Sequence, residues 1–235
     1  MKPIVILTGA GISAESGLAT FRDANGLWCG HRVEDVATPE AFVSQPMLVH
    51  EFYNQRRRQL KEVAPNAAHH ALELLAAKYP ERVTIITQNV DDLHQRAGRS
   101  AAILPMHGDL FKVRCEVSEQ VFEWHDDLDI HSVCQCCGKT GRLRPHIVWF
   151  GEMPLYMDAI ESVLSQCGLF VSIGTSGNVY PAAGLVRIAR MHGARTVELN
   201  LEPSQVGSAF DECRYGKAAS IVPAFVEEVL KSYSA

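Results

Sequence analysis

The 235-residue chain has no apolar run close to the length of about 18 residues that crosses a membrane as a helix. Its longest apolar runs have the length of a β-strand. The amino terminus, where Met1, Lys2 and Pro3 precede a short apolar run, lacks the longer apolar stretch and small-residue cleavage site of a secretory signal. We therefore expect a cytoplasmic protein without membrane contact.

Long runs of basic residues are also absent. The chain carries 22 Lys+Arg and 27 Asp+Glu, a net charge of -5, and three consecutive arginines at 56–58 do not make a basic patch. This balance argues against a nucleic-acid-binding protein. Apolar residues make up 47% of the chain, which excludes wholesale disorder, collagen and coiled coil. The length fits one main domain with a small insert.

Short β-branched apolar segments that end in small or polar residues predict buried parallel strands. They lie at residues 4–8, 83–87, 169–173 and 196–199. Helical spacing of apolar residues separates them, at residues 66–79, 158–166, 182–192 and 223–233. Strands that alternate with helices predict an α/β fold with a doubly wound, Rossmann-like parallel sheet, in which ligands bind beyond the carboxyl ends of the strands.

Two regions break this alternation. Residues 29–63 contain turns and then a helical pattern from about 39 to 60, and residues 109–144 are polar and hold four of the seven cysteines. We predict that these insertions form a smaller lobe, made of a helical segment and a zinc-knuckle segment. The larger lobe then comprises about 1–28, 64–108 and 145–235.

The segment Gly9-Ala10-Gly11-Ile12-Ser13-Ala14 fits the pattern GxGxxA directly after a predicted strand. In dinucleotide-binding proteins such glycines let the backbone approach a pyrophosphate, and the following helix offers free N–H groups. A structural turn that happens to contain two glycines is the alternative. A dehydrogenase would also need an acidic residue at the end of a second strand, whereas Glu34 and Asp35 are expected in a loop.

Seven motifs occur along the chain in a recognisable order. They are GAGIS (9–13), ESGLATFR (15–22), TQNVDDLH (87–94), MHG (106–108), VWFGE (148–152), GTS (174–176) and NLE (200–202). Together they resemble the sirtuin family of NAD-dependent protein deacylases, over nearly the whole chain. The resemblance is to bacterial sirtuins of the desuccinylase branch, and it implies a single catalytic domain that removes acetyl and succinyl groups from protein lysines.

The resemblance also implies catalytic residues. Asn89 and Asp91 would position nicotinamide and ribose, although from the residues alone either could simply cap the next helix. His107 would be the general base, because an imidazole with a pKa near ~6.5 can take a proton from a sugar hydroxyl at neutral pH. The substrate amide oxygen would attack the ribose carbon that loses nicotinamide, and the acyl group would leave on ADP-ribose.

The positions that would bind NAD follow from the same motifs. They are Gly9, Ala10, Gly11, Ile12, Ser13, Phe21, Arg22, Trp28, Gln88, Asn89, Val90, Asp91, Gly174, Thr175, Ser176, Asn200, Leu201, Glu202 and Ala218.

Cys134 and Cys137 form a CxxC pair, and Cys115 lies upstream. A tetrahedral zinc site needs two such pairs, but Ser118 stands where the partner of Cys115 would be. Zinc could use Cys115, Cys134 and Cys137 with Cys136, His125 or His131 as the fourth ligand, or the lobe could be metal-free with reduced thiols. A bound ion would be structural, because the sirtuin reaction uses NAD.

Tyr53 and Arg56 lie three residues apart on a predicted helix and could jointly hold a carboxylate. Desuccinylating sirtuins carry Tyr-x-x-Arg here, whereas the plain alternative is a solvated helix face. The resemblance implies that Val148, Phe150 and Gly151 line the acyl-lysine site and pair with the substrate backbone. A core strand is the alternative for this segment.

Two other classes of function remain possible from the sequence alone. A dehydrogenase is disfavoured by the missing ribose anchor. A non-catalytic module that binds NAD or ADP-ribose is disfavoured by His107, Asn89 and Asp91 occurring together. We expect a monomer whose partners are acylated lysines on cytosolic proteins.

Overall fold

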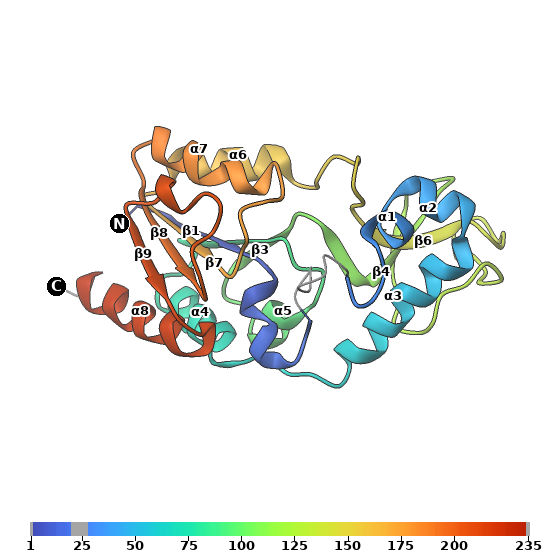
Figure 1. Ribbon diagram of the computed structural model, residues 1–235, viewed down its shortest axis with the longest axis horizontal. Coiled ribbons are helices and arrows are strands. Elements are labelled where there is room, and N and C mark those ends of the chain that lie inside the picture. The colour runs from blue at the N-terminus through green and yellow to red at the C-terminus, as the bar shows by residue number, and fades with distance from the viewer. Residues whose placement is uncertain (1, 20–27, 234–235) are drawn as a thin grey trace.

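The computed structural model describes residues 2–19 and 28–233, which contain two β-sheets (Figure 1). The larger sheet has six parallel strands in the order β3-β2-β1-β7-β8-β9. They are β1 (Ile4–Thr8), β2 (Val83–Thr87), β3 (Ala102–Pro105), β7 (Leu169–Ile173), β8 (Arg195–Asn200) and β9 (Glu212–Tyr215). The strand order reverses between β1 and β7, where sheets of this kind bind ligands.

Alternate residues of the central strands face opposite sides of this sheet. Ile4 and Ile6 belong to one apolar core, whereas Val5 and Leu7 belong to another. Helices α4 (Ala67–Lys78) and α8 (Ala218–Tyr233) cover the first face, and α6 (Met157–Gln166) and α7 (Leu185–Met191) cover the second (Figure 1). The predicted doubly wound parallel sheet is confirmed.

The helix ends follow local signals except where packing overrides them. Asn66 caps α4 by accepting a hydrogen bond from the Ala68 N–H at 2.9 Å. The predicted start of the last helix at residue 223 is wrong, because α8 begins at Ala218 and contains Pro223. Val222 is fully buried in the core, and this packing offsets the backbone hydrogen bond that the proline cannot donate.

The loop after β1 does not lead directly into an α-helix, whereas the GxGxxA pattern of dinucleotide-binding proteins does. Two single 3₁₀ turns follow, η1 (Ala10–Ile12) and η2 (Ala14–Ser16), and η2 ends at Gly17 with a φ of 99°. The side-chain amide of Asn66 donates to the Ile12 carbonyl at 2.8 Å and so ties these turns to the start of α4.

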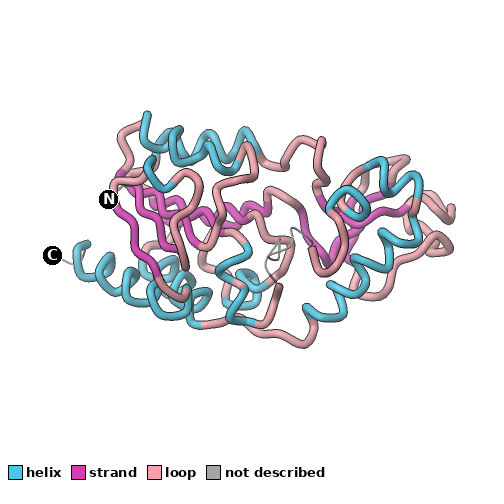
Figure 2. The backbone as a smooth tube through the Cα atoms, in the orientation of Figure 1, coloured by secondary structure: helices cyan, strands magenta, loops and turns pink. Residues whose placement is uncertain are grey.

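The second sheet and three helices gather at one end of the molecule (Figure 2). The antiparallel sheet has the order β5-β4-β6, with β4 (Gly108–Cys115), β5 (Val121–Glu123) and β6 (Leu143–Ile147). The helices are α1 (Val33–Val36), α2 (Pro39–Ser44) and α3 (Pro46–Leu60). Pro46 divides the predicted 39–60 segment in two, since it starts α3. Glu34 and Asp35 lie in α1, so the expected loop is wrong.

The remaining elements are short. They are α5 (Leu93–Ala97), η3 (Ala182–Gly184) and η4 (Gly207–Ala209). In the described part of the chain, no helix is both long and apolar enough to cross a membrane.

Candidate active site

The loops after β1 and β7 touch through their backbones. The Gly11 N–H donates to the Gly174 carbonyl at 2.8 Å. A Cβ atom on Gly11 would lie 2.7 Å from the Gly174 Cα, and Gly174 has a φ of +63°, so both positions require glycine. The N–H groups of Gly9, Gly11, Ile12 and Ser13 all donate to backbone carbonyls, so they do not supply the free N–H groups expected of a phosphate loop.

Ser13 joins two of the predicted catalytic residues. Its hydroxyl accepts a hydrogen bond from the Asn89 side-chain amide at 3.1 Å and donates one to the Asp91 carboxylate at 3.0 Å. All three side chains are buried. Asn89 and Asp91 follow β2, and Ser13 follows the neighbouring β1, so the parallel register brings them together. The sequence placed Ser13 among the NAD contacts but did not indicate this link.

Burial raises the pKa of Asp91 to about 6, although hydrogen bonds from the Leu93 N–H and Ser13 counteract that increase. The Leu93 N–H donates to Asp91 Oδ1 at 3.1 Å, near the start of α5. Asp91 therefore stabilises the beginning of a helix and also presents its second oxygen to Ser13. The helix-capping interpretation of the sequence therefore holds for Asp91.

His107 lies in the turn between β3 and β4 and is half-buried. Its Nδ1 lies 3.1 Å from the Gln88 carbonyl. Because a carbonyl can only accept, Nδ1 carries the proton and Nε2 of the neutral ring is left as the basic nitrogen. Burial lowers the pKa of His107 below 6.5, so the ring is neutral at pH 7.

Several predicted NAD contacts surround the same edge of the sheet. The Gln88 amide donates to the Thr175 hydroxyl at 3.0 Å, and the Asn200 amide donates to the Thr175 carbonyl at 2.9 Å. This links the ends of β2, β7 and β8. Ala10 and Val90 lie beside these loops, whereas Ser176, Leu201 and Glu202 are solvent-exposed.

Three further predicted contacts have different positions. Ala218 begins α8, and the next N–H, of Ala219, donates to the Glu15 carboxylate at 2.7 Å. Trp28 packs edge-on against Phe52 in the smaller group of elements, with ring centres 4.9 Å apart. Phe21 and Arg22 lie outside the described residues.

The predicted substrate segment 148–151 begins next to His107. The Val148 N–H donates to the His107 carbonyl at 2.9 Å, and the Phe150 N–H donates to the Ala37 carbonyl at 3.0 Å. This segment is a turn after β6, not the core strand considered as the alternative. Phe150 is 40% exposed, and Gly151, with a φ of +91°, is also exposed.

Tyr53 and Arg56 lie on α3 in the same region. Tyr53 is completely buried, and its hydroxyl accepts a hydrogen bond from the Trp149 indole N–H at 2.9 Å. The guanidinium of Arg56 lies over the Phe52 ring, 3.7 Å from its centre, and its buried Nε has no hydrogen-bond partner among the described residues. Arg56 is therefore not an ordinary solvated arginine.

Four clustered cysteines form a candidate metal site. The Sγ atoms of Cys115, Cys134, Cys136 and Cys137 all lie within 4.8 Å of one another, near the separation of about 3.8 Å in a tetrahedral zinc–thiolate site. Backbone N–H groups of Ser118 and Val117 lower the pKa of Cys115 to about 6, which favours the thiolate that zinc needs. These residues fit one structural zinc ion.

Cys136 completes this cluster, whereas His125 and His131 lie outside it. His125 packs against Phe111, with ring centres 4.8 Å apart. Ser118 lies beside the cluster, with its hydroxyl 3.1 Å from Cys136 Sγ. At about 3.3 Å per residue, β4 separates Cys115 from His107 by roughly 25 Å, so a metal here cannot reach that imidazole.

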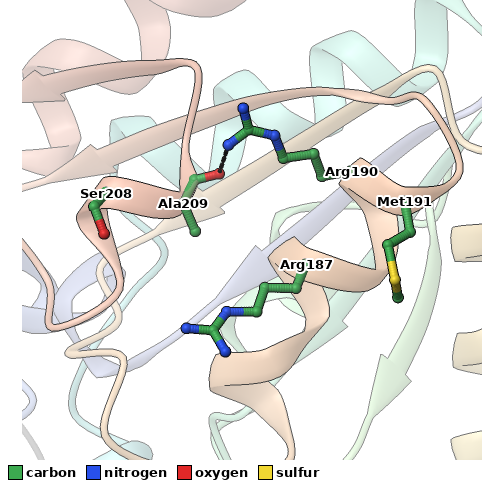
Figure 3. Close-up of a pocket in the computed structure, with 5 residues that line it drawn as sticks. All are labelled: Arg187, Arg190, Met191, Ser208 and Ala209. Atoms are coloured by element: carbon green, nitrogen blue, oxygen red, sulfur yellow. Dashed lines mark hydrogen bonds between the residues drawn. The ribbon is translucent and has the colours of Figure 1, made fainter.

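A surface pocket of about 510 Å³ lies between α7 and η4, away from these residues (Figure 3). It is lined by Arg187, Arg190, Met191, Ser208 and Ala209, and Arg190 donates to the Ala209 carbonyl at 3.1 Å. It contains none of the predicted site residues.

Comparisons with known proteins agree with this geometry. Residues 9–181 match the Sir2 family. The chain is 59% identical over 229 residues to the NAD-dependent protein deacylase of Pasteurella multocida, covering 97% of each chain. It is 62% identical over 232 residues to the NAD-dependent protein deacylase SIR2rp3 of Trypanosoma brucei brucei, covering 97% of this chain and 94% of the relative.

Solved structures give the same result. A mutant Sir2 homologue in complex with ADP ribose superposes with a TM-score of 0.90 at 36% identity, covering 99% of this chain and 94% of the other. A Sir2 homolog–NAD complex gives 0.87 at 37% identity, covering 98% and 90%. Sir2Af2 bound to a myristoylated histone peptide gives 0.75 at 31% identity, covering 99% and 93%.

The metal site makes a prediction about the fourth ligand. Cys136→Ser should lower the zinc bound per chain, whereas His125→Ala and His131→Ala should leave it unchanged. Because Ser118 lies next to Cys136, the exchange Ser118→Cys with Cys136→Ser should restore zinc. Metal analysis of purified protein measures this directly. Full zinc in Cys136→Ser alone would show that Cys136 is not a ligand.

Proposed function

This chain belongs to the Sir2 family and is an NAD-dependent deacylase of protein lysines, and we propose that it acts through the residues at the carboxyl edge of its six-stranded sheet. The observation that carries this proposal is the meeting of three groups. His107 is hydrogen-bonded to the Gln88 carbonyl, and Asn89, the residue after Gln88, belongs to the hydrogen-bond network of Ser13, Asn89 and Asp91. The Val148 N–H in turn donates to the His107 carbonyl. A base, a polar binding network and a peptide-binding segment are thus adjacent.

The donor set fits NAD. Amide, hydroxyl and carboxylate groups from Ser13, Asn89 and Asp91 suit a carboxamide and ribose hydroxyls, and Gln88, Thr175 and Asn200 extend the site toward β8. When bound, NAD supplies the ribose carbon that loses nicotinamide and takes up the acyl oxygen.

Each residue then has a physical role. Nε2 of His107 accepts a proton from a hydroxyl, because Nδ1 is already committed to the Gln88 carbonyl. Ser13 fixes the orientation of Asn89 and Asp91 by bonding to both. The ionised carboxylate of Asp91 places negative charge where positive charge develops as nicotinamide departs.

The acyl-lysine would lie along 148–151. The exposed turn at Phe150 and Gly151 leaves backbone accessible for an extended peptide, a mode of recognition that tolerates many sequences. We propose one catalytic domain whose smaller lobe, about 29–63 and 109–144, holds the zinc ion, whereas the larger lobe, about 1–28, 64–108 and 145–235, binds NAD and carries the segment 148–151.

We propose that both acetyl and succinyl groups are accepted. Two donors on α3, the Tyr53 hydroxyl and the Arg56 Nε, have no acceptor among the described residues, and the surroundings are apolar. A carboxylate at the end of an acyl chain would satisfy both donors, because guanidinium and phenol groups bind carboxylates strongly. An acetyl group is small enough to enter without using them.

We propose that the protein acts in the cytoplasm. None of the seven cysteines forms a disulfide, and four of them cluster as candidate metal ligands, a usage typical of a reducing compartment. This supports the cytoplasm and cytosolic acylated proteins as substrates. We propose a monomer as the working form.

The acyl preference can be tested with Arg56→Met. It should lower kcat/KM for a succinylated peptide by about 10- to 100-fold, the value of a hydrogen bond to a charged group, and change the acetylated peptide by less than about threefold. Arg58→Met is the matched control, since Arg58 is exposed on the same helix and pairs with Glu51. Equal losses of kcat/KM for both peptides would show that Arg56 has a structural role and does not bind the acyl carboxylate.

The pH dependence follows from two shifted groups. The pKa of Asp91 is raised to about 6 and that of His107 is lowered from 6.5. Both must be deprotonated, so kcat/KM for the acetylated peptide should fall as the pH drops through about 6. Above that pH the buried Asp91 charge costs stability, so Asp91→Asn should raise Tm at pH 8 while reducing activity. A loss of activity centred near pH 4 would contradict these roles.

A further inference from the structure

The hydrogen bond between Trp149 and Tyr53 has a defined direction. An indole N–H can only donate, so the Tyr53 oxygen is the acceptor in the 2.9 Å contact. This leaves the Tyr53 O–H hydrogen for a different partner. Among the described residues Tyr53 makes no second hydrogen bond, and its side chain is completely buried.

Trp149 is itself held from two sides. The Arg144 guanidinium stacks on its indole, 3.5 Å from the ring centre. The Glu152 carboxylate accepts the Trp149 backbone N–H at 2.8 Å and binds Arg144 through both oxygens at 2.7 and 2.9 Å. Trp149 is only 2% exposed. The indole N–H therefore reaches Tyr53 from a fixed position.

A buried hydroxyl whose oxygen already accepts a hydrogen bond and whose hydrogen has no acceptor among the described residues favours one kind of ligand. A ligand with an acceptor satisfies the O–H, whereas a ligand without one leaves it unpaired at a cost. Arg56, one turn further along α3, adds a second donor without a partner at Nε. Both donors select for a carboxylate.

We propose that Trp149 is a positioning residue for acyl selectivity. By occupying the acceptor side of the Tyr53 oxygen, its indole N–H directs the hydroxyl hydrogen toward the carboxylate of an acidic acyl chain. This inference rests on the proposed binding of such a carboxylate by Tyr53 and Arg56. It adds Trp149 to the residues that determine acyl selectivity, and Trp149 acts through Tyr53 without contact to the acyl chain.

Trp149→Phe removes the indole N–H and keeps an aromatic ring. We expect the ratio of kcat/KM for succinylated over acetylated peptide to fall by about three- to tenfold, mainly through a higher KM for the succinylated peptide. Trp124→Phe is the matched control, because the Trp124 indole donates to the Asp127 carbonyl at 3.4 Å and packs against a different apolar cluster from that of Tyr53. It should leave the ratio unchanged.

A double-mutant comparison distinguishes a positioning role of Trp149 from a purely structural one. In a Tyr53→Phe background the hydroxyl is absent, so adding Trp149→Phe should not lower the ratio further. A merely structural Trp149 would lower both rates in either background. An unchanged ratio in Trp149→Phe, or an equal drop in the Tyr53→Phe background, overturns the positioning role. An unchanged ratio in Tyr53→Phe alone shows instead that the proposed carboxylate site fails, and the positioning role fails with it.

A measurement on the wild-type chain and Tyr53→Phe covers the case in which Trp149→Phe does not fold. The chain has three tryptophans, so ¹⁵N-tryptophan labelling gives three indole N–H signals. One signal should move in Tyr53→Phe, and the same signal should move on adding succinylated but not acetylated peptide. No common signal, or equal movement with both peptides, overturns the proposal.

Discussion

The contact between the loops after β1 and β7 determines the position of the residues that we propose as catalytic. The Gly11 N–H binds the Gly174 carbonyl at 2.8 Å, with space for no side chain on either residue. This close approach places Ser13 beside the end of β2, where it bonds to both Asn89 and Asp91. The glycines of the GxGxxA pattern are therefore required first by the packing of two loops.

The central strands could be predicted from the sequence because both faces of a parallel sheet are buried, which demands near-continuous apolar runs such as 4–8 and 169–173. The edge strand β9 could not, since its residues Glu212–Tyr215 are half-buried or exposed and Glu212 pairs with Arg214. The start of α8 was obscured by Pro223, which local signals place outside a helix interior. Tertiary packing decided both cases.

For the site, motifs located residues but not the contacts among them. The motif around His107 identified the imidazole, whereas only the structure shows that Gln88 fixes the proton on Nδ1 and leaves Nε2 basic. The spacing of Cys134 and Cys137 indicated a metal knuckle, but a missing cysteine at Ser118 left the fourth ligand open. Three-dimensional proximity singles out Cys136. Trp149 belongs to the motif VWFGE, but the sequence offered no reason to assign it a role, because nothing in the sequence pairs it with Tyr53.

The central claim is that the His107 imidazole acts as the base in NAD-dependent lysine deacylation. The most direct measurement is mass spectrometry of acetylated and succinylated forms of one lysine peptide, incubated with NAD and either the wild-type chain or folded His107→Ala. The account predicts NAD-dependent loss of the acyl group with release of nicotinamide and acyl-ADP-ribose for the wild type, and almost no deacylated peptide for His107→Ala. Full deacylation by the variant would contradict it.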